Sequence, residues 1–288
     1  MMTNSEKTIL VCGATGGQGG ATVRHLLRQG FNVRALTRNA EGDGAKALRE
    51  IGATVVQGDM GDKDSLKAAF DGVQGVFSVQ NTQISGVEGE IAQGKNVADL
   101  ARDSGAHLVY TSAMKGENTG IPHFDSKTQI EAYIESLGIP YTILLPVGFM
   151  EVLTEKAFYP AMTAWHLQPR VMGEDAPQSW IAVDDIGAAS AAVFADPAAY
   201  AGRKIALVGD QKSIGQCRAI YADVMGKKPS SFPFPLWIFE RFMAKEVVVM
   251  WRWLRDVGYT VDVAQTRAVI PDVMDLRTWL TKKRDGQL

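Results

Sequence analysis

The stretch Thr8-Ile-Leu-Val-Cys-Gly-Ala-Thr-Gly-Gly-Gln-Gly-Gly20 decides the fold of this chain. Its apolar start predicts a buried β-strand, and three glycines follow at a spacing of three, Gly13, Gly16 and Gly19. Apolar residues then recur with the period of a helix until Gly30. A strand, a glycine turn and a helix in this order are typical of a dinucleotide-binding site. A glycine-rich turn without a ligand is the alternative.

Each of the three glycines has a physical role in such a site. Gly13 permits the tight turn after the strand, Gly16 lets the backbone approach a pyrophosphate, and Gly19 lets the helix pack on the strand. The free N–H groups at the helix N-terminus then face the phosphates. The residues of this segment that we expect to contact the cofactor are Gly13, Thr15, Gly16, Gly17, Gln18 and Gly19.

The composition indicates a globular protein and argues against several kinds of binding site. The 288 residues are 46% hydrophobic and 22% charged, with a net charge of −2. Such a chain forms a sizeable core, and it has no basic stripe, so we expect no nucleic-acid partner. Two cysteines, Cys12 and Cys217, make no disulfide framework, and the histidines lack the spacing of metal ligands, so we expect no metal site.

No segment predicts a membrane anchor. Residues 234–253 are rich in aromatic and aliphatic side chains, but charged residues interrupt every apolar run of the length a bilayer needs. An amphipathic helix that covers a pocket or a dimer surface is the better interpretation, and a homodimer is one expected partner arrangement. The polar N-terminus has no signal-peptide pattern, which predicts a cytoplasmic location.

Strand-like and helical segments alternate as far as Leu145, which predicts the α/β class with a Rossmann-type doubly wound parallel sheet. We expect residues 1–150 to form the dinucleotide-binding domain. Residues 151–288 are expected to form a smaller α-rich lobe that partly extends the sheet. In that lobe we expect a helix at 186–194, capped by Asp184 or Asp185, and further helices at 213–225, 236–257 and about 273–283.

The end of the second predicted strand indicates which dinucleotide is bound. An NAD site usually has an acidic residue there, on the ribose 2′-hydroxyl, but this chain has Thr37-Arg38-Asn39. A guanidinium pairs well with a 2′-phosphate, so Arg38 predicts NADP(H); a solvated arginine at a strand end is the alternative. Asp59 is expected to accept from the adenine amino group, with Met60 on the ring, or else to be a turn carboxylate.

With these residues identified, the chain resembles the NmrA-like branch of the atypical short-chain dehydrogenase/reductases. The motifs that carry the resemblance are Gly13-Ala-Thr-Gly-Gly-Gln-Gly19, Thr37-Arg-Asn39, Gly58-Asp59, His123-Phe-Asp-Ser-Lys127 with Glu131 beyond, and Pro146-Val-Gly-Phe-Met150. It covers roughly residues 7 to 225 and extends weakly to the end. The resemblance implies an NADP(H)-binding Rossmann fold.

The resemblance also raises the question of catalysis. Reductases of the wider superfamily use a tyrosine and a lysine four residues later on one helical face. The lysine lowers the tyrosine's pKa and holds the nicotinamide ribose, and the phenol donates a proton. Here His123 takes the tyrosine's place, with Lys127 in register. Lys127 and, as a second candidate, His123 are therefore the expected catalytic residues; a histidine at a helix start without a catalytic duty is the alternative.

For a chain with this substitution, the family resemblance implies two alternative functions. The first is a redox-state sensor that binds NADP(H) without hydride transfer and signals to a regulatory protein partner through loop 39–44 or 116–122. The second is an NADPH-dependent reductase of small apolar substrates such as quinones, enone-like phenolics or dyes. A partner-binding protein that has lost the cofactor is a third hypothesis, which the intact glycine pattern disfavours.

Other residues are weaker candidates. Gln80, followed by Asn81 and Thr82, is expected to line the nicotinamide side. Ser112 lies where the superfamily's catalytic serine is found, and a serine that caps the backbone is the alternative. Aromatic residues are candidates for the wall of an apolar pocket or for the core, and they are Phe149, Phe158, Tyr159, Trp165 and Trp180. Of these, Phe149 is also an expected cofactor contact.

Overall fold

The computed structural model describes residues 2–116, 119–154, 163–230 and 233–288. The chain divides into two compact units, and each is taken by itself below. The first unit contains residues 1–113, 123–145 and 184–205, and the second contains 114–122, 146–183 and 206–288. The domain boundary expected at residue 150 lies close to one of the points where the chain passes between the units.

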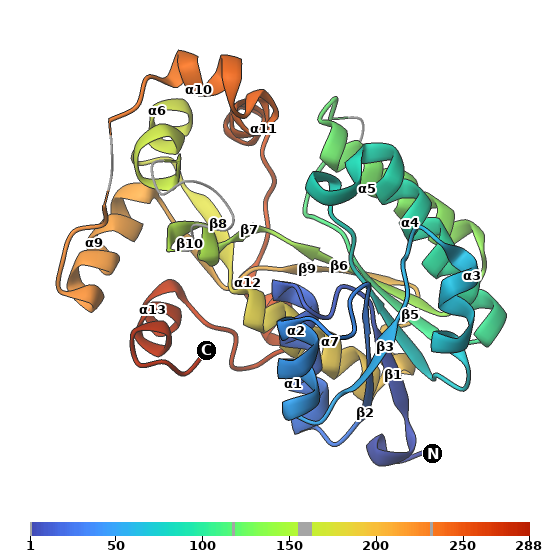
Figure 1. Cartoon of the computed structure of the whole chain (residues 1–288). Helices are drawn as coiled ribbons and strands as arrows, with labels where there is room; N and C mark the ends of the chain where they lie inside the picture. The colour runs from blue at the N-terminus through green and yellow to red at the C-terminus, as the bar shows by residue number, and fades with distance from the viewer. Residues whose placement is uncertain (1, 117–118, 155–162, 231–232) are drawn as a thin grey trace. The chain divides into compact units, whose positions relative to one another are not determined.

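The first unit is built on a seven-stranded sheet of order β3-β2-β1-β4-β5-β6-β9 (Figure 1). Its strands are β1 Thr8–Val11, β2 Asn32–Thr37, β3 Thr54–Gln57, β4 Gly75–Ser78, β5 His107–Thr111, β6 Tyr141–Pro146 and β9 Arg203–Leu207. The pairs from β3 to β6 are parallel. This order confirms the doubly wound Rossmann-type sheet, and β9 is the extension expected from the later part of the chain. From β1 to β3 the chain adds strands on one side of β1, and from β4 on it adds them on the other side. Ligands of such sheets bind at this switch point, between β1 and β4.

Helices cover both faces of this sheet (Figure 1). The helices that belong to the first unit are α1 Gly17–Arg28, α2 Asp43–Glu50, α3 Lys63–Leu66, α4 Thr82–Ser104, α5 Pro122–Ser136, α7 Val183–Ala195 and α8 Pro197–Tyr200. One core lies between the strands and α3, α4 and α5, and residues such as Leu10, Leu66, Val97 and Ile130 form it. Burying each such side chain contributes about 1.5–3 kcal/mol.

On the opposite face α7 packs against both α1 and the sheet. A Cβ at Gly187 of α7 would lie 2.5 Å from the Ala21 carbonyl carbon of α1, and one at Gly75 of β4 would lie 2.5 Å from Cε1 of Phe194 in α7. Only glycine permits these approaches, because a real Cβ does not come so close to another heavy atom. The glycines therefore set how tightly this layer packs.

The second unit has a three-stranded sheet of order β10-β8-β7, formed by Asp210–Lys212, Gln178–Ile181 and Gly148–Phe149. Its helices are α6 Gln168–Met172, α9 Ile214–Met225, α10 Leu236–Phe242, α11 Lys245–Asp256, α12 Val263–Arg267 and α13 Leu276–Arg284, with a 3₁₀ turn at Met150–Leu153 and a π-helical turn at Thr163–Leu167. The α-rich character expected for this part is confirmed.

Three sequence predictions need correction. The helix expected at 236–257 is two helices, because Ala244 adopts φ −154° and ψ 63° between α10 and α11. The segment expected at about 273–283 becomes helical only at Leu276. Finally, α7 begins at Val183, so Asp184 and Asp185 lie in its first turn and neither is the N-cap.

Candidate functional site

The glycine turn after β1 has the close geometry expected of it. Gly13 has φ +65°, and a Cβ there would lie 2.7 Å from Cγ1 of Val79. A Cβ at Gly19 would lie 2.2 Å from the Gly13 carbonyl oxygen, so the start of α1 rests directly on the turn. These two glycines thus have the turn and packing roles that the sequence predicts.

The N-terminus of α1 is left open by the same glycines. Gly16 is the N-cap and offers no side chain to the first helical N–H groups. Gln18 in the first turn accepts a hydrogen bond from Thr111, with 2.8 Å between Thr111 Oγ1 and Gln18 Oε1. A Cβ on Gly44, near the start of α2, would lie 3.2 Å from Thr15 Cγ2. The turn therefore lies between the end of β5 and the start of α2, with backbone donors available to an anion.

Arg38 follows β2 at the same edge of the sheet. Its side chain is exposed. No hydrogen bond or ion pair of Arg38 is found among residues 2–116, 119–154, 163–230 and 233–288. An exposed guanidinium without an internal partner keeps its donors for a ligand. Its role toward a 2′-phosphate stays a prediction.

Asp59 and Met60 follow β3. Asp59 Oδ1 accepts from the Gly61 backbone N–H at 2.8 Å, so this carboxylate makes the turn contact that the alternative interpretation assigns to it. Met60 is half-buried, and its carbonyl accepts from Asn96 Nδ2 at 2.9 Å. The turn contact occupies one carboxylate oxygen, and the adenine contact of Asp59 stays a prediction.

Gln80 follows β4 and turns inward. Its Nε2 donates to Ser78 Oγ at 2.8 Å and lies 3.6 Å from Met60 Sδ. Its Oε1 is buried and has no hydrogen-bond partner among the described residues, which leaves one acceptor unused at the ligand edge of the sheet. Asn81 caps α4 through the Gln83 N–H.

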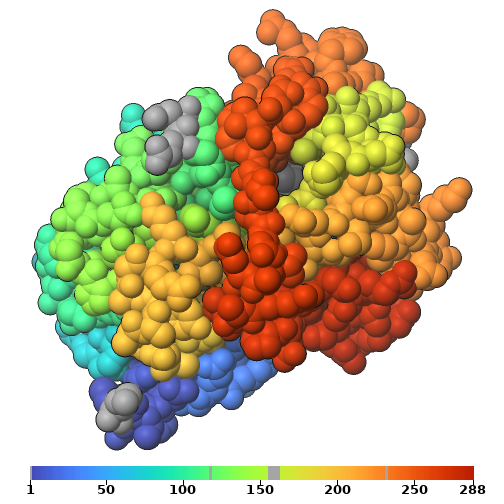
Figure 2. All heavy atoms as spheres, turned by 180° about the vertical axis from the view of Figure 1, so that it is seen from behind, coloured from blue at the N-terminus to red at the C-terminus, as the bar shows by residue number. Residues whose placement is uncertain are grey.

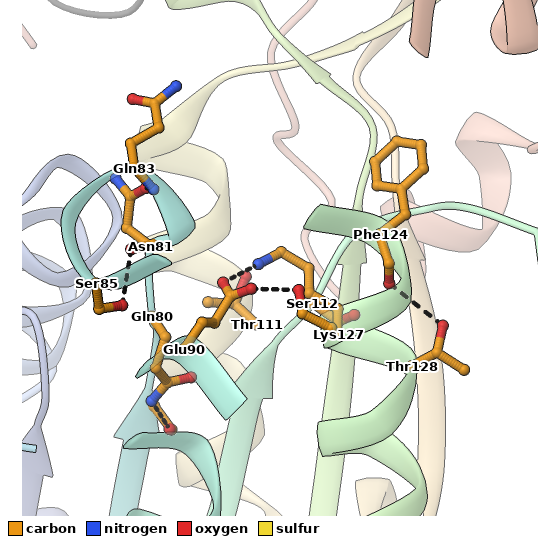
Figure 3. A network of polar contacts seen from close by, with 12 residues as sticks. Gln80, Asn81, Gln83, Ser85, Glu90, Thr111, Ser112, Phe124, Lys127 and Thr128 are labelled. Carbon is orange, nitrogen blue, oxygen red and sulfur yellow. Dashed lines mark hydrogen bonds and ion pairs between the residues drawn. The ribbon is translucent and has the colours of Figure 1, made fainter. Parts of the chain in front are cut away.

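Lys127 is held by a buried carboxylate (Figure 3). Its Nζ lies 2.5 Å from Oε1 of Glu90, and the hydroxyl of Ser126 donates to Oε2 of the same residue. The Glu90 side chain is 0% exposed, whereas that of Lys127 is 16% exposed. The ammonium group therefore has an internal anchor, and the Lys127 side chain is not completely buried.

A second buried carboxylate, that of Glu131, lies on α5 one helical turn after Lys127. Glu131 accepts from the hydroxyl of Ser112 and from Lys204 Nζ, the latter at 3.0 Å. The Ser112 hydroxyl therefore bonds to a side chain, not to the backbone groups that the alternative predicted. Tyr110 is fully buried, and its hydroxyl has no hydrogen-bond partner among the described residues. Burial first, and then Glu90 and Glu131, raise the pKa of Tyr110 well above its usual value, so this tyrosine stays neutral.

His123 lies in the first turn of α5, as the helix-start interpretation expects. It is half-buried, and its ring meets that of Phe124 edge to face with 4.7 Å between centroids. The sequence also contains one tyrosine and lysine at a spacing of four, Tyr200 and Lys204. Tyr200 ends α8 and Lys204 lies in β9, so this pair does not share a helical face.

The aromatic candidates of the second unit lie mainly in its core. Trp180 is 2% exposed and Trp165 is 4% exposed, and both belong to one apolar cluster. Their indole N–H groups donate to the carbonyls of Lys212 and Leu153. Phe149 in β7 is half-buried. Phe158 and Tyr159 lie outside the described residues, as does part of loop 116–122.

Glu90 is the site residue that the sequence analysis missed. On α4 it is aligned with the buried small and apolar residues, which are Gly94, Val97, Ala98 and Ala101. A glutamate aligned with an apolar face indicates a buried carboxylate that needs a cation or hydroxyl partner. The sequence shows this alignment, but it does not show which residue of α5 Glu90 contacts.

Over residues 2–116, 119–154, 163–230 and 233–288, no group of three or more His, Cys, Asp and Glu side chains is arranged to hold a metal ion. Within the same ranges no helix is both long and apolar enough to span a bilayer.

Comparison with known sequences gives a consistent result. A family model described as the NmrA-like family matches residues 5–279. An NmrA-like family domain-containing oxidoreductase of Aspergillus flavus, lnaB, is 32% identical over 263 residues, which span 82% of this chain and 78% of the relative.

Solved structures share the fold at low identity. NmrA, described as a negative transcriptional regulator and crystallised with NADP, is 21% identical with a TM-score of 0.78, over 99% of this chain and 98% of that chain. A triphenylmethane reductase of Citrobacter sp., crystallised with NADP(H), is 21% identical with a TM-score of 0.74, over 98% of this chain and 100% of that chain. One neighbour is a regulator and the other a reductase, so the fold alone does not separate these roles.

Proposed function

The chain belongs to the NmrA-like family, and from this premise we propose that it binds NADP(H) and uses it to reduce a small apolar acceptor. The observation that carries the proposal is the side chain of Lys127, whose ammonium group is anchored by Glu90 and which is 16% exposed. In the His123–Lys127 motif, Lys127 corresponds to the lysine that, as the family resemblance implies, holds the nicotinamide ribose. The oxidoreductase name of the Aspergillus flavus relative supports a redox role.

The residues present fit a dinucleotide. At Gly13 and Gly19 the turn has no room for a Cβ, and the Gly16 N-cap leaves helix donors free for a pyrophosphate. Arg38 would bind the 2′-phosphate, and Lys127 would donate to the ribose hydroxyls. The bound cofactor would supply a hydride.

The missing tyrosine limits the substrates that this site suits. A quinone, an enone or a cationic dye accepts a hydride and yields a delocalised anion or a neutral product, so no strong acid is needed at the moment of transfer. Where a proton must follow, Lys127 or water would provide it. An unconjugated ketone would form a localised alkoxide, and position 123, where reductases of the superfamily have the tyrosine that donates the proton, is a histidine in this chain.

A redox-state sensor remains the second candidate. It is favoured by one observation, the His123 substitution at the position of the superfamily tyrosine. Anaerobic oxidation of NADPH against quinones, enones, aldehydes and dyes separates the two. Turnover that falls in Lys127→Met supports the reductase, and tight NADPH binding without turnover on any acceptor supports the sensor.

A further inference from the structure

We propose that Glu90 is a positioning residue of the cofactor site, which anchors the Lys127 ammonium before the nicotinamide ribose arrives. This inference rests on the proposed role of Lys127 in binding NADP(H). It assigns a task to the buried carboxylate on α4.

Close packing between α4 and α5 brings the two residues together. A Cβ on Gly94 would lie 2.8–2.9 Å from three side-chain carbons of Ile130, so α4 touches α5 through a glycine. Glu90 lies one helical turn before Gly94, and Ser126 lies one turn before Ile130. The same approach therefore places the Glu90 carboxylate at Ser126 and Lys127, where both contacts form.

The burial of Glu90 calls for an explanation that stability alone does not supply. An ion pair with a buried carboxylate is often no more stabilising than well-packed apolar residues of similar volume. Glu90 lies on a face whose other buried members, such as Val97 and Ala98, are small or apolar. An apolar residue at position 90 would suit that core, whereas a carboxylate suits a lysine that must be held in place.

The geometry leaves Lys127 equipped for a ligand. An ammonium group has three N–H donors and no acceptor. One donor is directed to Glu90 Oε1, and the Lys127 ammonium has no other hydrogen bond in the described part of the chain. The two remaining donors match the two hydroxyls of a ribose. A free lysine side chain would lose rotamer freedom on binding, and Glu90 removes that freedom in advance.

The proposal is tested by NADPH affinity, measured by fluorescence titration of full-length wild type, Glu90→Gln, Lys127→Met and the double variant. Glu90→Gln keeps the size of the side chain and its contact with Ser126 but loses the charge. We expect each single variant to weaken NADPH binding about tenfold, and the double variant to bind no more weakly than Lys127→Met. Asp99→Asn, which removes the charge of another α4 carboxylate that bonds Tyr133 of α5 and Lys63 but not Lys127, is the matched control and should stay within about twofold of wild type.

The outcomes separate this inference from the proposed function. If Lys127→Met weakens binding and Glu90→Gln does not, or if Glu90→Gln weakens binding equally in the Lys127→Met background, the positioning role is wrong. If wild type does not bind NADPH, or Lys127→Met leaves the affinity unchanged, the proposed function fails as well. Should Glu90→Gln not fold, judged by circular dichroism, Glu90→Asp replaces it. Wild-type affinity in Glu90→Asp, whose shorter side chain does not reach Lys127 as Glu90 does, would overturn the proposal.

Discussion

Glu90 and Lys127 form an ion pair across α4 and α5, with 2.5 Å between Oε1 and Nζ and with the carboxylate removed entirely from solvent. A lysine that would otherwise be a mobile surface side chain thus has one defined position.

Replacing Gly19 by alanine should destabilise the turn. Its new Cβ would lie 2.2 Å from the Gly13 carbonyl oxygen, so backbone must move, at a cost of about 1–3 kcal/mol in the free energy of unfolding. Gly20→Ala is the matched control, because its Cβ would be 3.4 Å from the nearest atom, and it should be neutral or stabilising by up to about 1 kcal/mol. Urea unfolding of both variants is the measurement, and equal stabilities would contradict the packing role of Gly19.

His123→Ala should have a small effect on turnover. Its ring contacts Phe124 at the start of α5, and we assign it no proton transfer. On any acceptor that the wild type reduces, we expect kcat/KM to fall by less than about tenfold, against the roughly 10²–10⁴-fold that loss of a general acid costs. A fall in that larger range, with NADPH affinity unchanged, would identify His123 as the acid.

The free energy of unfolding should fall as the pH is lowered, because His107 of β5 is buried without charge in the folded chain. Burial lowers its pKa from 6.5 to about 4, and its Nε2 lies 2.9 Å from Thr142 Oγ1. Between these two values the unfolded chain binds the extra proton, so the free energy of unfolding falls as pH drops from about 6.5 to about 4, by up to about 3 kcal/mol. Urea unfolding at several pH values should show a shallower slope in His107→Gln. An unchanged slope would mean that other groups cause the decline.

An apolar surface on α10 and its end predicts self-association. Trp237, Phe242 and Met243 are 66%, 72% and 53% exposed, and Figure 2 shows this orange segment at an outer edge of the second unit. Such a surface is unfavourable in water. We expect a homodimer in sedimentation at micromolar concentration and a monomer for Trp237→Ser combined with Phe242→Ser. A monomeric wild type would contradict this expectation.

The sequence predicts local features of the fold well. The strand, the glycine turn and the alternation up to residue 145 depend on neighbours in the chain, and they are confirmed. The break between α10 and α11 was missed because no glycine or proline marks it. It allows Phe239 and Trp251 to stack, with 6.1 Å between ring centroids, and that contact depends on tertiary packing.

The site was predictable in part for the same reason. Lys127 was singled out from its motif because a motif is local, and its role stays a prediction. Glu90 and Ser126 could not be paired from the sequence, since their contact requires α4 and α5 to approach through Gly94. The inward turn of Gln80 toward Ser78 likewise depends on side-chain packing at the end of β4.

In the function proposed above, this chain binds NADP(H) and Arg38 selects the 2′-phosphate. Titration of wild type and Arg38→Ala with NADPH and NADH tests it most directly. We predict that wild type binds NADPH at least about tenfold more tightly than NADH, and that Arg38→Ala loses this preference while its NADH affinity is unchanged. Equal affinity of the wild type for the two cofactors, or no binding of either, would contradict the account.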